Sequence, residues 1–300
     1  MLKVAWNEHY AHKLPEGHRF PMEKYNLLPQ QLLHEGTLTK ENFFDPECIS
    51  EERVLRIHSS EYLEKLKKCE LSRKEERATG FPLSDQLVKR ELMISQGTIE
   101  AVEFAIENGA SGNIAGGTHH AYRDRGEGFC LLNDIAIGSS YALNELNLEK
   151  ILVVDLDVHQ GNGTAKIFEN DPSVFTFSMH GAKNYPLHKE KSDLDIPLPD
   201  GTMDQDYLKI LRETLPGLMD EVSPDLIFFQ SGVDILESDK LGRLALTLNG
   251  SKQRDEIVFS EAKKRGIPVV FNMGGGYSKK ISVIIEAHAN TYRTARDLHF

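Results

Sequence analysis

Cysteine and tryptophan are scarce in this chain, with 3 and 1 among 300 residues. The cysteine count is odd and no two cysteines are spaced as a CxxC pair, which argues against a disulfide framework or a cysteine zinc knuckle. No apolar stretch approaches the ~20 residues that cross a bilayer. The start of the sequence also lacks the apolar core of a signal peptide. We therefore expect a cytoplasmic protein of a reducing compartment, with no membrane association.

Basic residues are outnumbered, with 35 Lys and Arg against 46 Asp and Glu and a net charge of −11. No dense patch of Lys and Arg interrupts this balance, so the composition argues against direct nucleic-acid binding. Repeats, low-complexity segments and obvious linkers are absent, although 300 residues would allow one large α/β domain or two ordinary ones. The most polar segment, residues 69–82, is expected to be a surface loop or a solvated helix end.

From about residue 113 onward, short apolar runs alternate with amphipathic stretches. The runs predict strands over residues 113–115, 151–158, 174–178, 226–230 and 268–272. The amphipathic stretches predict helices over residues 85–108, 133–146, 164–169, 203–220, 251–265 and 279–298. Thr202 and Gln205 have the spacing of a capping box at the start of one helix. This alternation predicts a parallel sheet with helices on both faces.

A polar or glycine-rich cluster follows each of four buried runs. In chain order the clusters occupy residues 116–120, 155–159, 230–234 and 272–277. Open α/β sheets bind ligands beyond the carboxyl ends of their strands. We therefore expect the four clusters to meet in one crevice.

The segment over residues 151–163 carries the clearest chemical signal. Its apolar start is typical of a central parallel strand, and Asp155, Asp157 and His159 follow at alternate positions, which predicts that they point to one side. With Asp234, the residues Asp157 and His159 make a three-ligand site with room for water or substrate, as catalytic zinc requires. The same donors suit Mn²⁺ or Fe²⁺. Taken alone, Asp234 would be interpreted as a turn aspartate.

Two adjacent histidines and a tyrosine are candidates for proton transfer and charge stabilisation. His119 and His120 follow two glycines, where a tight turn allows both rings to face a pocket. Tyr277 follows three glycines, which let the backbone bend sharply and present the hydroxyl to a developing oxyanion. Taken singly, these would be ordinary loop histidines and a packed tyrosine. The loops over residues 126–130 and 184–186 carry aromatic side chains that could form the walls of a slot.

Together these segments resemble the zinc-dependent histone deacetylase family. The matching segments run in family order over nearly the whole chain: Gly116-Gly-Thr-His-His-Ala, Gly126-Glu-Gly-Phe-Cys, Asp155-Leu-Asp-Val-His-Gln-Gly-Asn-Gly, Gly232-Val-Asp and Gly274-Gly-Gly-Tyr. Residues 232–242 and 252–258 look most like the class IV branch. The resemblance implies one catalytic domain over residues 1–300 with a three-layer arginase/deacetylase-like fold. In that fold, helices cover both faces of a mostly parallel central sheet of about eight strands.

The resemblance also implies catalytic roles. His120 would be the general base and acid, with His119 as an electrostatic partner held by Asp155. Asn162 stands where many relatives have an aspartate behind the catalytic histidine, and a neutral amide stabilises an imidazolium less than a carboxylate does. Tyr277 would polarise the acyl carbonyl.

The implied ion and substrate sites involve the neighbouring residues. Asp157, His159 and Asp234 would bind Zn²⁺, and backbone carbonyls of this segment would accommodate K⁺ as a structural ion. The substrate-binding residues implied by the resemblance are Gly128, Phe129, Tyr185, Gly275 and Lys24.

The reaction implied is hydrolysis of the acyl amide on the ε-amine of lysine in proteins or peptides. Class IV relatives are associated with long fatty acyl groups as well as acetyl, so the resemblance predicts appreciable activity on long-chain acyl-lysine, with acetyl-lysine weaker. Three alternatives stay open: a deacetylase of small acylated amines such as acetylpolyamines, an arginase-like ureohydrolase, and a catalytically weak acyl-lysine binding module. The ureohydrolase would need more bridging aspartates than the sequence offers.

Overall fold

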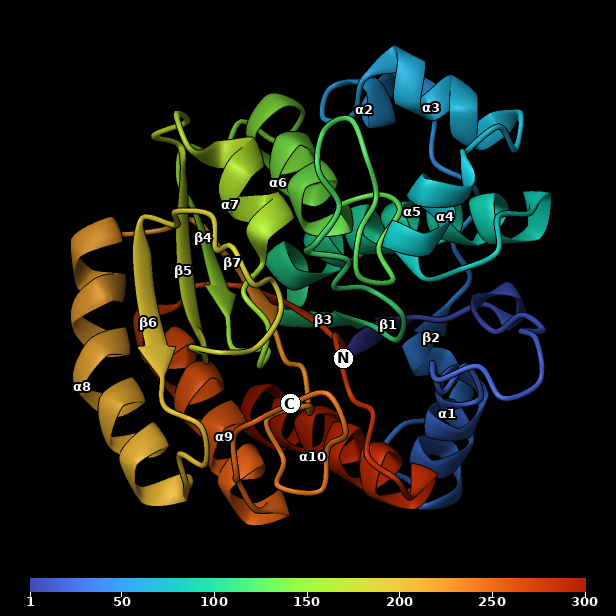
Figure 1. The fold of residues 1–300 in the computed structure, drawn as a ribbon. Coiled ribbons are helices and arrows are strands. Elements are labelled where there is room, and N and C mark those ends of the chain that lie inside the picture. The colour runs from blue at the N-terminus through green and yellow to red at the C-terminus, as the bar shows by residue number, and fades with distance from the viewer.

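Eight parallel strands form the centre of the computed structural model, which describes residues 1–300 (Figure 1). Their order across the sheet is β2-β1-β3-β8-β7-β4-β5-β6. The strands are β1 (Lys3–Ala5), β2 (Phe43–Phe44), β3 (Ala110–Asn113), β4 (Ile151–Asp155), β5 (Val174–Gly181), β6 (Leu194–Leu198), β7 (Leu226–Gln230) and β8 (Val269–Asn272). The predicted parallel sheet of about eight strands is therefore confirmed.

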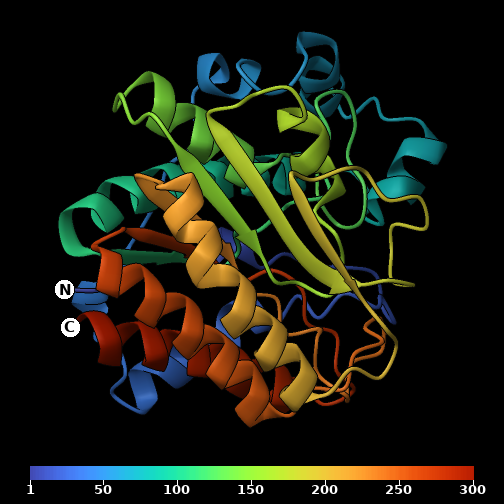
Figure 2. The same cartoon turned by 90° about the vertical axis from the view of Figure 1, so that its left-hand side faces the viewer.

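Helices cover both faces of this sheet. Figures 1 and 2 show α5, α6 and α7 on one face and α8, α9 and α10 on the other, with α1 beside α10. The α-helices are α1 (Lys24–His34), α2 (Glu51–Leu55), α3 (Ser60–Lys67), α4 (Arg73–Thr79), α5 (Asp85–Asn108), α6 (Asp134–Asn144), α7 (Asn162–Phe168), α8 (Asp204–Val222), α9 (Leu248–Arg265) and α10 (Ile281–His299). Two single turns, η1 (Glu8–Tyr10) and η2 (Lys40–Asn42), lie near the N-terminus. A cluster of 72 buried hydrophobic residues connects the layers.

All six predicted helices are present with ends shifted by a few residues, and the strands predicted over residues 174–178, 226–230 and 268–272 are present as β5, β7 and β8. The other strand predictions differ from the structure. The sequence pattern missed β1 and β2, which are only 3 and 2 residues long, and β6, which has a proline at the sheet edge. Strand β3 comprises Ala-Ser-Gly-Asn, residues with little β-propensity, and lies earlier than predicted. A glycine is required at position 112, because a Cβ there would lie only 2.6 Å from the Cζ atom of the Phe271 ring.

The predicted capping box at Thr202 is wrong. Helix α8 begins after Met203, which makes no side-chain cap, while the Thr202 hydroxyl donates to the carbonyl of Pro199 at 2.8 Å. The polar segment 69–82 instead contains a helix, α4, with a capping box between Ser72 and Glu75. No helix in the structure is both long and apolar enough to span a bilayer.

Candidate metal centre and active site

The four polar clusters follow β3, β8, β7 and β4, which are consecutive neighbours in the sheet. Since all four strands are parallel, their carboxyl ends lie at one edge, and the loops that follow them converge there. Three of the clusters line one cavity through His119, His120, Asp157 and Tyr277. The fourth joins them through Asp234, whose carboxylate lies 3.1 Å from His159 Nδ1, so the predicted meeting of the clusters is confirmed.

Strand β4 ends at Asp155 rather than continuing to Val158 as predicted. The chain turns there, and the Asp157 amide donates to the Asp155 carboxylate at 3.2 Å. The interpretation that strand alternation points Asp155, Asp157 and His159 to one side is therefore wrong. Asp155 contacts His119, whereas Asp157 contacts His159.

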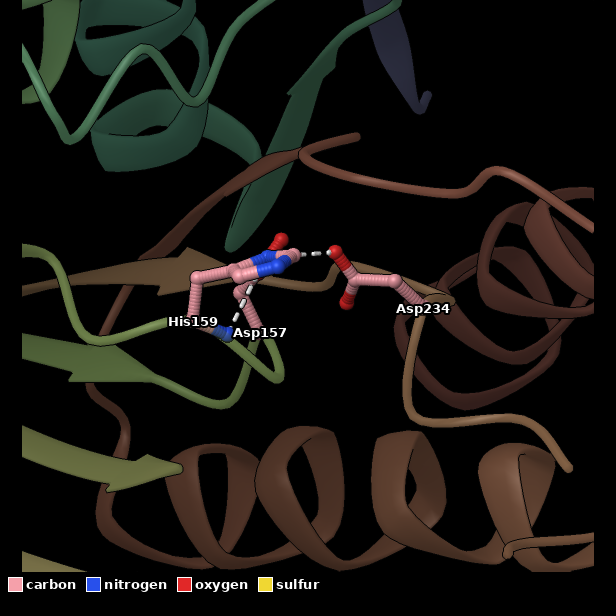
Figure 3. A group of neighbouring side chains, drawn as sticks. All are labelled: Asp157, His159 and Asp234. Carbon is pink, nitrogen blue, oxygen red and sulfur yellow. Dashed lines mark hydrogen bonds and ion pairs between the residues drawn. The ribbon is translucent and has the colours of Figure 1, made fainter. Parts of the chain in front are cut away.

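Asp157, His159 and Asp234 form a buried cluster whose ligand atoms all lie within 4.8 Å of one another (Figure 3). His159 Nδ1 is 3.0 Å from one oxygen of Asp157 and 3.1 Å from one oxygen of Asp234. Backbone amides hold the other oxygens: Gly275 N donates to Asp157 at 2.8 Å, and Val158 N donates to Asp234 at 3.0 Å. Three side chains that could bind a metal ion, from two loops, thus converge on one point.

The charges of this cluster favour a bound cation. Burial lowers the pKa of His159, but hydrogen bonds with Asp157 and Asp234 outweigh it and raise that pKa to about 10. Burial, together with the charge of Asp157, raises the pKa of Asp234 to about 7. A divalent cation would neutralise both carboxylates in place of a proton, and two carboxylates with one imidazole fit Zn²⁺, Mn²⁺ or Fe²⁺.

The turn that carries the histidine pair is held by Asp134, at the start of α6. Its carboxylate accepts hydrogen bonds from the backbone amides of Gly117 and Thr118 and from the Thr118 hydroxyl, at 2.7–3.1 Å. Gly117 has φ +100°, and a Cβ there would lie 2.1 Å from Gln230. The glycine is therefore required for this close turn.

His119 and His120 lie with ring centroids 4.1 Å apart but have different partners. His119 Nδ1 is 2.7 Å from Asp155, and His120 Nδ1 is 2.6 Å from the Asn162 side-chain oxygen. Burial lowers the pKa of both rings, and for His119 the charge of Asp155 reverses the effect and raises it. For His120, burial and the two neighbouring imidazoles keep the pKa well below its usual value. His120 is therefore the neutral ring, able to accept a proton.

Tyr277 presents an unpartnered hydroxyl to the cavity, since no group of the chain accepts from it, while its backbone amide donates to Asp239 at 2.6 Å. Burial and the nearby Asp234 and Asp157 raise its pKa well above the usual value, so the phenol stays protonated as a donor. The glycine turn before it is structurally required, because a Cβ on Gly275 would lie 1.9 Å from the Asp234 carboxylate.

The cavity has a small inner part and a wider mouth. The inner part, about 30 Å³, lies beside Asp157 and His159, and it is lined by Gly128, Phe129 and Gly275, three of the residues expected to bind substrate. The mouth, about 380 Å³, is lined by Gly128, Phe129 and Tyr185 beside His120 and His159. Phe129 and Tyr185 therefore stand at the opening, in the place expected of tunnel walls.

Lys24 is the predicted substrate residue that the structure places differently. Its side chain is buried behind the wall, where Nζ donates to the carbonyl of Gly274 at 3.1 Å and lies 5.6 Å from the Tyr277 ring centroid. Burial lowers its pKa to about 8, although Asp234 and Asp157 act in the opposite direction. Lys24 supports the glycine turn and does not line the cavity.

Two residues at the cavity, Arg90 and Glu127, were not predicted from the sequence pattern. Arg90, on α5, lines the inner cavity and donates to the Tyr10 carbonyl at 2.7 Å. Its signal was a charged residue on the buried face of an amphipathic helix. Glu127 accepts from the Tyr185 hydroxyl at 2.6 Å and from Asn162 Nδ2 at 3.5 Å, linking a wall of the mouth to the partner of His120. Its signal was an acid within the Gly126–Cys130 motif.

Known proteins with a similar sequence or structure point to one family. The family described as "Histone deacetylase domain" matches residues 18–292. An uncharacterized protein of Picosynechococcus sp. is 42% identical over 99% of both chains. Histone deacetylase 2 of Arabidopsis thaliana is 32% identical over 89% of this chain and 72% of its own. The crystal structure of a histone deacetylase homologue complexed with SAHA superimposes with a TM-score of 0.85 at 22% identity, covering 99% of this chain and 84% of that one. That structural likeness shows that the arginase/deacetylase-like fold is shared.

Proposed function

Because the chain belongs to the histone deacetylase family, we propose that it is a zinc-dependent hydrolase that removes acyl groups from the ε-amine of lysine. One observation carries the proposal. A buried Asp157-His159-Asp234 cluster, a neutral His120 and the unpartnered hydroxyl of Tyr277 face one cavity. Metal ligands, base and hydrogen-bond donor are the groups that amide hydrolysis requires.

The metal would be held by Asp157, His159 and Asp234. When bound, it supplies Lewis-acid activation of the acyl carbonyl and of a water molecule. His120 takes a proton from the attacking water on its free ring nitrogen while Asn162 holds Nδ1, and later delivers a proton to the leaving amine. Tyr277 donates to the acyl oxygen as negative charge develops there.

The alternatives differ in what the site would need. A module that only binds acyl-lysine has no use for a neutral base beside an unpartnered hydroxyl. An arginase-like enzyme needs a second metal, and the structure contains one cluster of suitable ligands. Acetylpolyamines would use the same catalytic groups, so the preference between acyl-lysine and acetylpolyamine substrates depends on the residues that line the mouth of the cavity.

The size of the inner cavity bears on the acyl group. About 30 Å³ holds little more than one or two waters, which supports acetyl or another short acyl group. Long fatty acyl groups, which the class IV resemblance implies, would require this cavity to open. We keep the class IV assignment as a proposal that rests on residues 232–242 and 252–258, and a structural K⁺ stays a prediction.

The proposed function is tested by a hydrolysis panel. Purified protein would be incubated with peptides carrying acetyl-, butyryl- and myristoyl-lysine and with N-acetylspermidine, and metal content would be measured on the same preparation. We expect stoichiometric zinc and the highest kcat/KM with a short acyl-lysine. Absence of hydrolysis of every acyl-lysine by metal-loaded protein would contradict the proposal.

The Tyr277 hydroxyl gives a further prediction. Tyr277→Phe removes one donor and almost no volume, so kcat should fall by about 10²-fold while KM changes far less. Single-turnover kinetics with the acetyl-lysine peptide would measure the two parameters separately. Equal losses in binding and in kcat would mean that the hydroxyl only positions the substrate. Tyr141→Phe is the matched control, since that hydroxyl bonds to Glu103 away from the site.

A further inference from the structure

The mouth of the cavity carries two arginines that the proposed chemistry does not use. Arg19 and Arg77 line the same depression as His120, His159 and Tyr277, and both side chains are exposed. No carboxylate oxygen lies within 4.0 Å of either guanidinium. In a chain with a net charge of −11, two arginines without an ion-pair partner therefore line the mouth beside His120 and Tyr277.

Backbone hydrogen bonds near Arg77 and a ring contact of Arg19 hold the two arginines at the wall of the mouth. Arg77 is in the last turn of α4. The carbonyls of the two residues that follow it in this helix, Ala78 and Thr79, accept hydrogen bonds from the amides of Gly128 and Phe129 at 3.0 and 2.7 Å. Figure 1 shows α4 beside this loop. The guanidinium of Arg19 lies over the Phe129 ring, 5.0 Å from its centroid, in cation–π geometry. Both cations thus flank one tunnel wall.

The acidic group at the mouth does not neutralise them. Glu127 is the one carboxylate of a lining residue there, and three other groups occupy it. Arg125 donates to it at 2.9 Å, the Tyr185 hydroxyl at 2.6 Å and Asn162 at 3.5 Å. Among the residues that line the mouth, Arg19 and Arg77 are therefore cations without an ion-pair partner, while the one carboxylate is already paired.

We infer that Arg19 and Arg77 form a subsite for a carboxylate next to the acyl-lysine. This rests on the proposed function and specifies its substrate class. The carboxylate is either the α-carboxylate of a terminal or free acyl-lysine or an acidic side chain flanking it in a peptide, and guanidinium groups bind both in the same way. The subsite disfavours cationic acetylpolyamines and acyl-lysines flanked by basic residues, because their positive charges would be repelled by the two guanidinium groups.

The test varies substrate charge while the acyl group stays constant. Acetyl-lysine peptides of equal length would be flanked by Glu, Ala or Lys, and Nα-capped acetyl-lysine would be compared with its carboxamide. We expect kcat/KM at low salt to be roughly three- to tenfold higher with Glu than with Lys flanks. The preference should decrease as salt screens the charges. A larger preference among the flanked peptides identifies the carboxylate as a neighbouring acidic side chain. A larger preference for Nα-capped acetyl-lysine over its carboxamide identifies it as the α-carboxylate.

The variants assign the preference to these residues. In Arg19→Gln/Arg77→Gln the ratio of Glu-flanked to Lys-flanked kcat/KM should fall to about one, and Arg19→Glu/Arg77→Glu, which makes the subsite negative, should invert it. Arg73→Gln is the matched control, because Arg73 is exposed on the same helix outside the mouth, and it should keep the wild-type ratio and activity. A double variant with the wild-type ratio would overturn the subsite. Failure of wild-type protein on all the acetyl-lysine substrates, the neutral ones included, would overturn the proposed function as well.

Discussion

Replacing Asp157 or Asp234 by alanine should remove the bound metal and reduce acyl-lysine hydrolysis to background. Each carboxylate supplies one of only three protein ligand atoms, and the remaining pair would be one carboxylate and one imidazole. Loss of an outer-shell partner alone costs 10–100-fold in metal affinity, so loss of a ligand should weaken binding by more than about a hundredfold. Metal analysis after dialysis and kcat/KM on the acetyl-lysine peptide measure the two effects.

Folding must be separated from binding in these variants. The Asp157 carboxylate accepts the Gly275 amide, so alanine leaves that buried donor unpaired and destabilises the glycine turn. Asp157→Asn keeps an acceptor and the shape of the side chain while removing the charge, and it should also lose metal. Asp220→Ala, at an exposed ion pair on α8, is the control and should keep both metal and activity. Stoichiometric metal in both alanine variants would contradict the assignment.

His120→Ala should slow the chemical step by about 10²–10⁴-fold while the metal stays bound. The ring is not among the three ligands, and its Nδ1 is already occupied by Asn162. Its low pKa, caused by burial and then by His119 and His159, keeps the other nitrogen free to accept a proton. Single-turnover rates together with metal content on one preparation distinguish the loss of a base from the loss of the metal.

The control for this experiment is His34→Ala, which removes an exposed imidazole at the end of α1. It should leave rate and metal content unchanged. Turnover of His120→Ala within about threefold of wild type, below the range expected for a general base, would exclude His120 from proton transfer. Loss of metal from His120→Ala would instead indicate that the ring supports the metal cluster through its contact with His159.

Much of the site was predictable because the chemistry is concentrated in short segments. The pairs Asp157 with His159 and His119 with His120 are close in sequence, and each follows a buried strand, of which β4 is marked by its apolar run. Parallel strands bring their carboxyl ends to one edge whatever their order. Residue types and spacing therefore sufficed to place Asp157, His159, His120 and Tyr277 in one crevice, and helical periodicity sufficed to identify the long helices.

The sequence by itself thus determined the α/β architecture and the set of reactive groups, but only the tertiary structure decided their partners. Gly275 binds Asp157 from 118 residues away, and Asn162 binds His120 from 42 residues away. Lys24 lies behind the wall while Arg90 lines the inner cavity, and Arg19 and Arg77 meet at the mouth from separate segments. Local periodicity shows which face of an element is buried. Which charged groups meet depends on how helices and loops far apart in the chain pack against the sheet, and no local pattern contains that information.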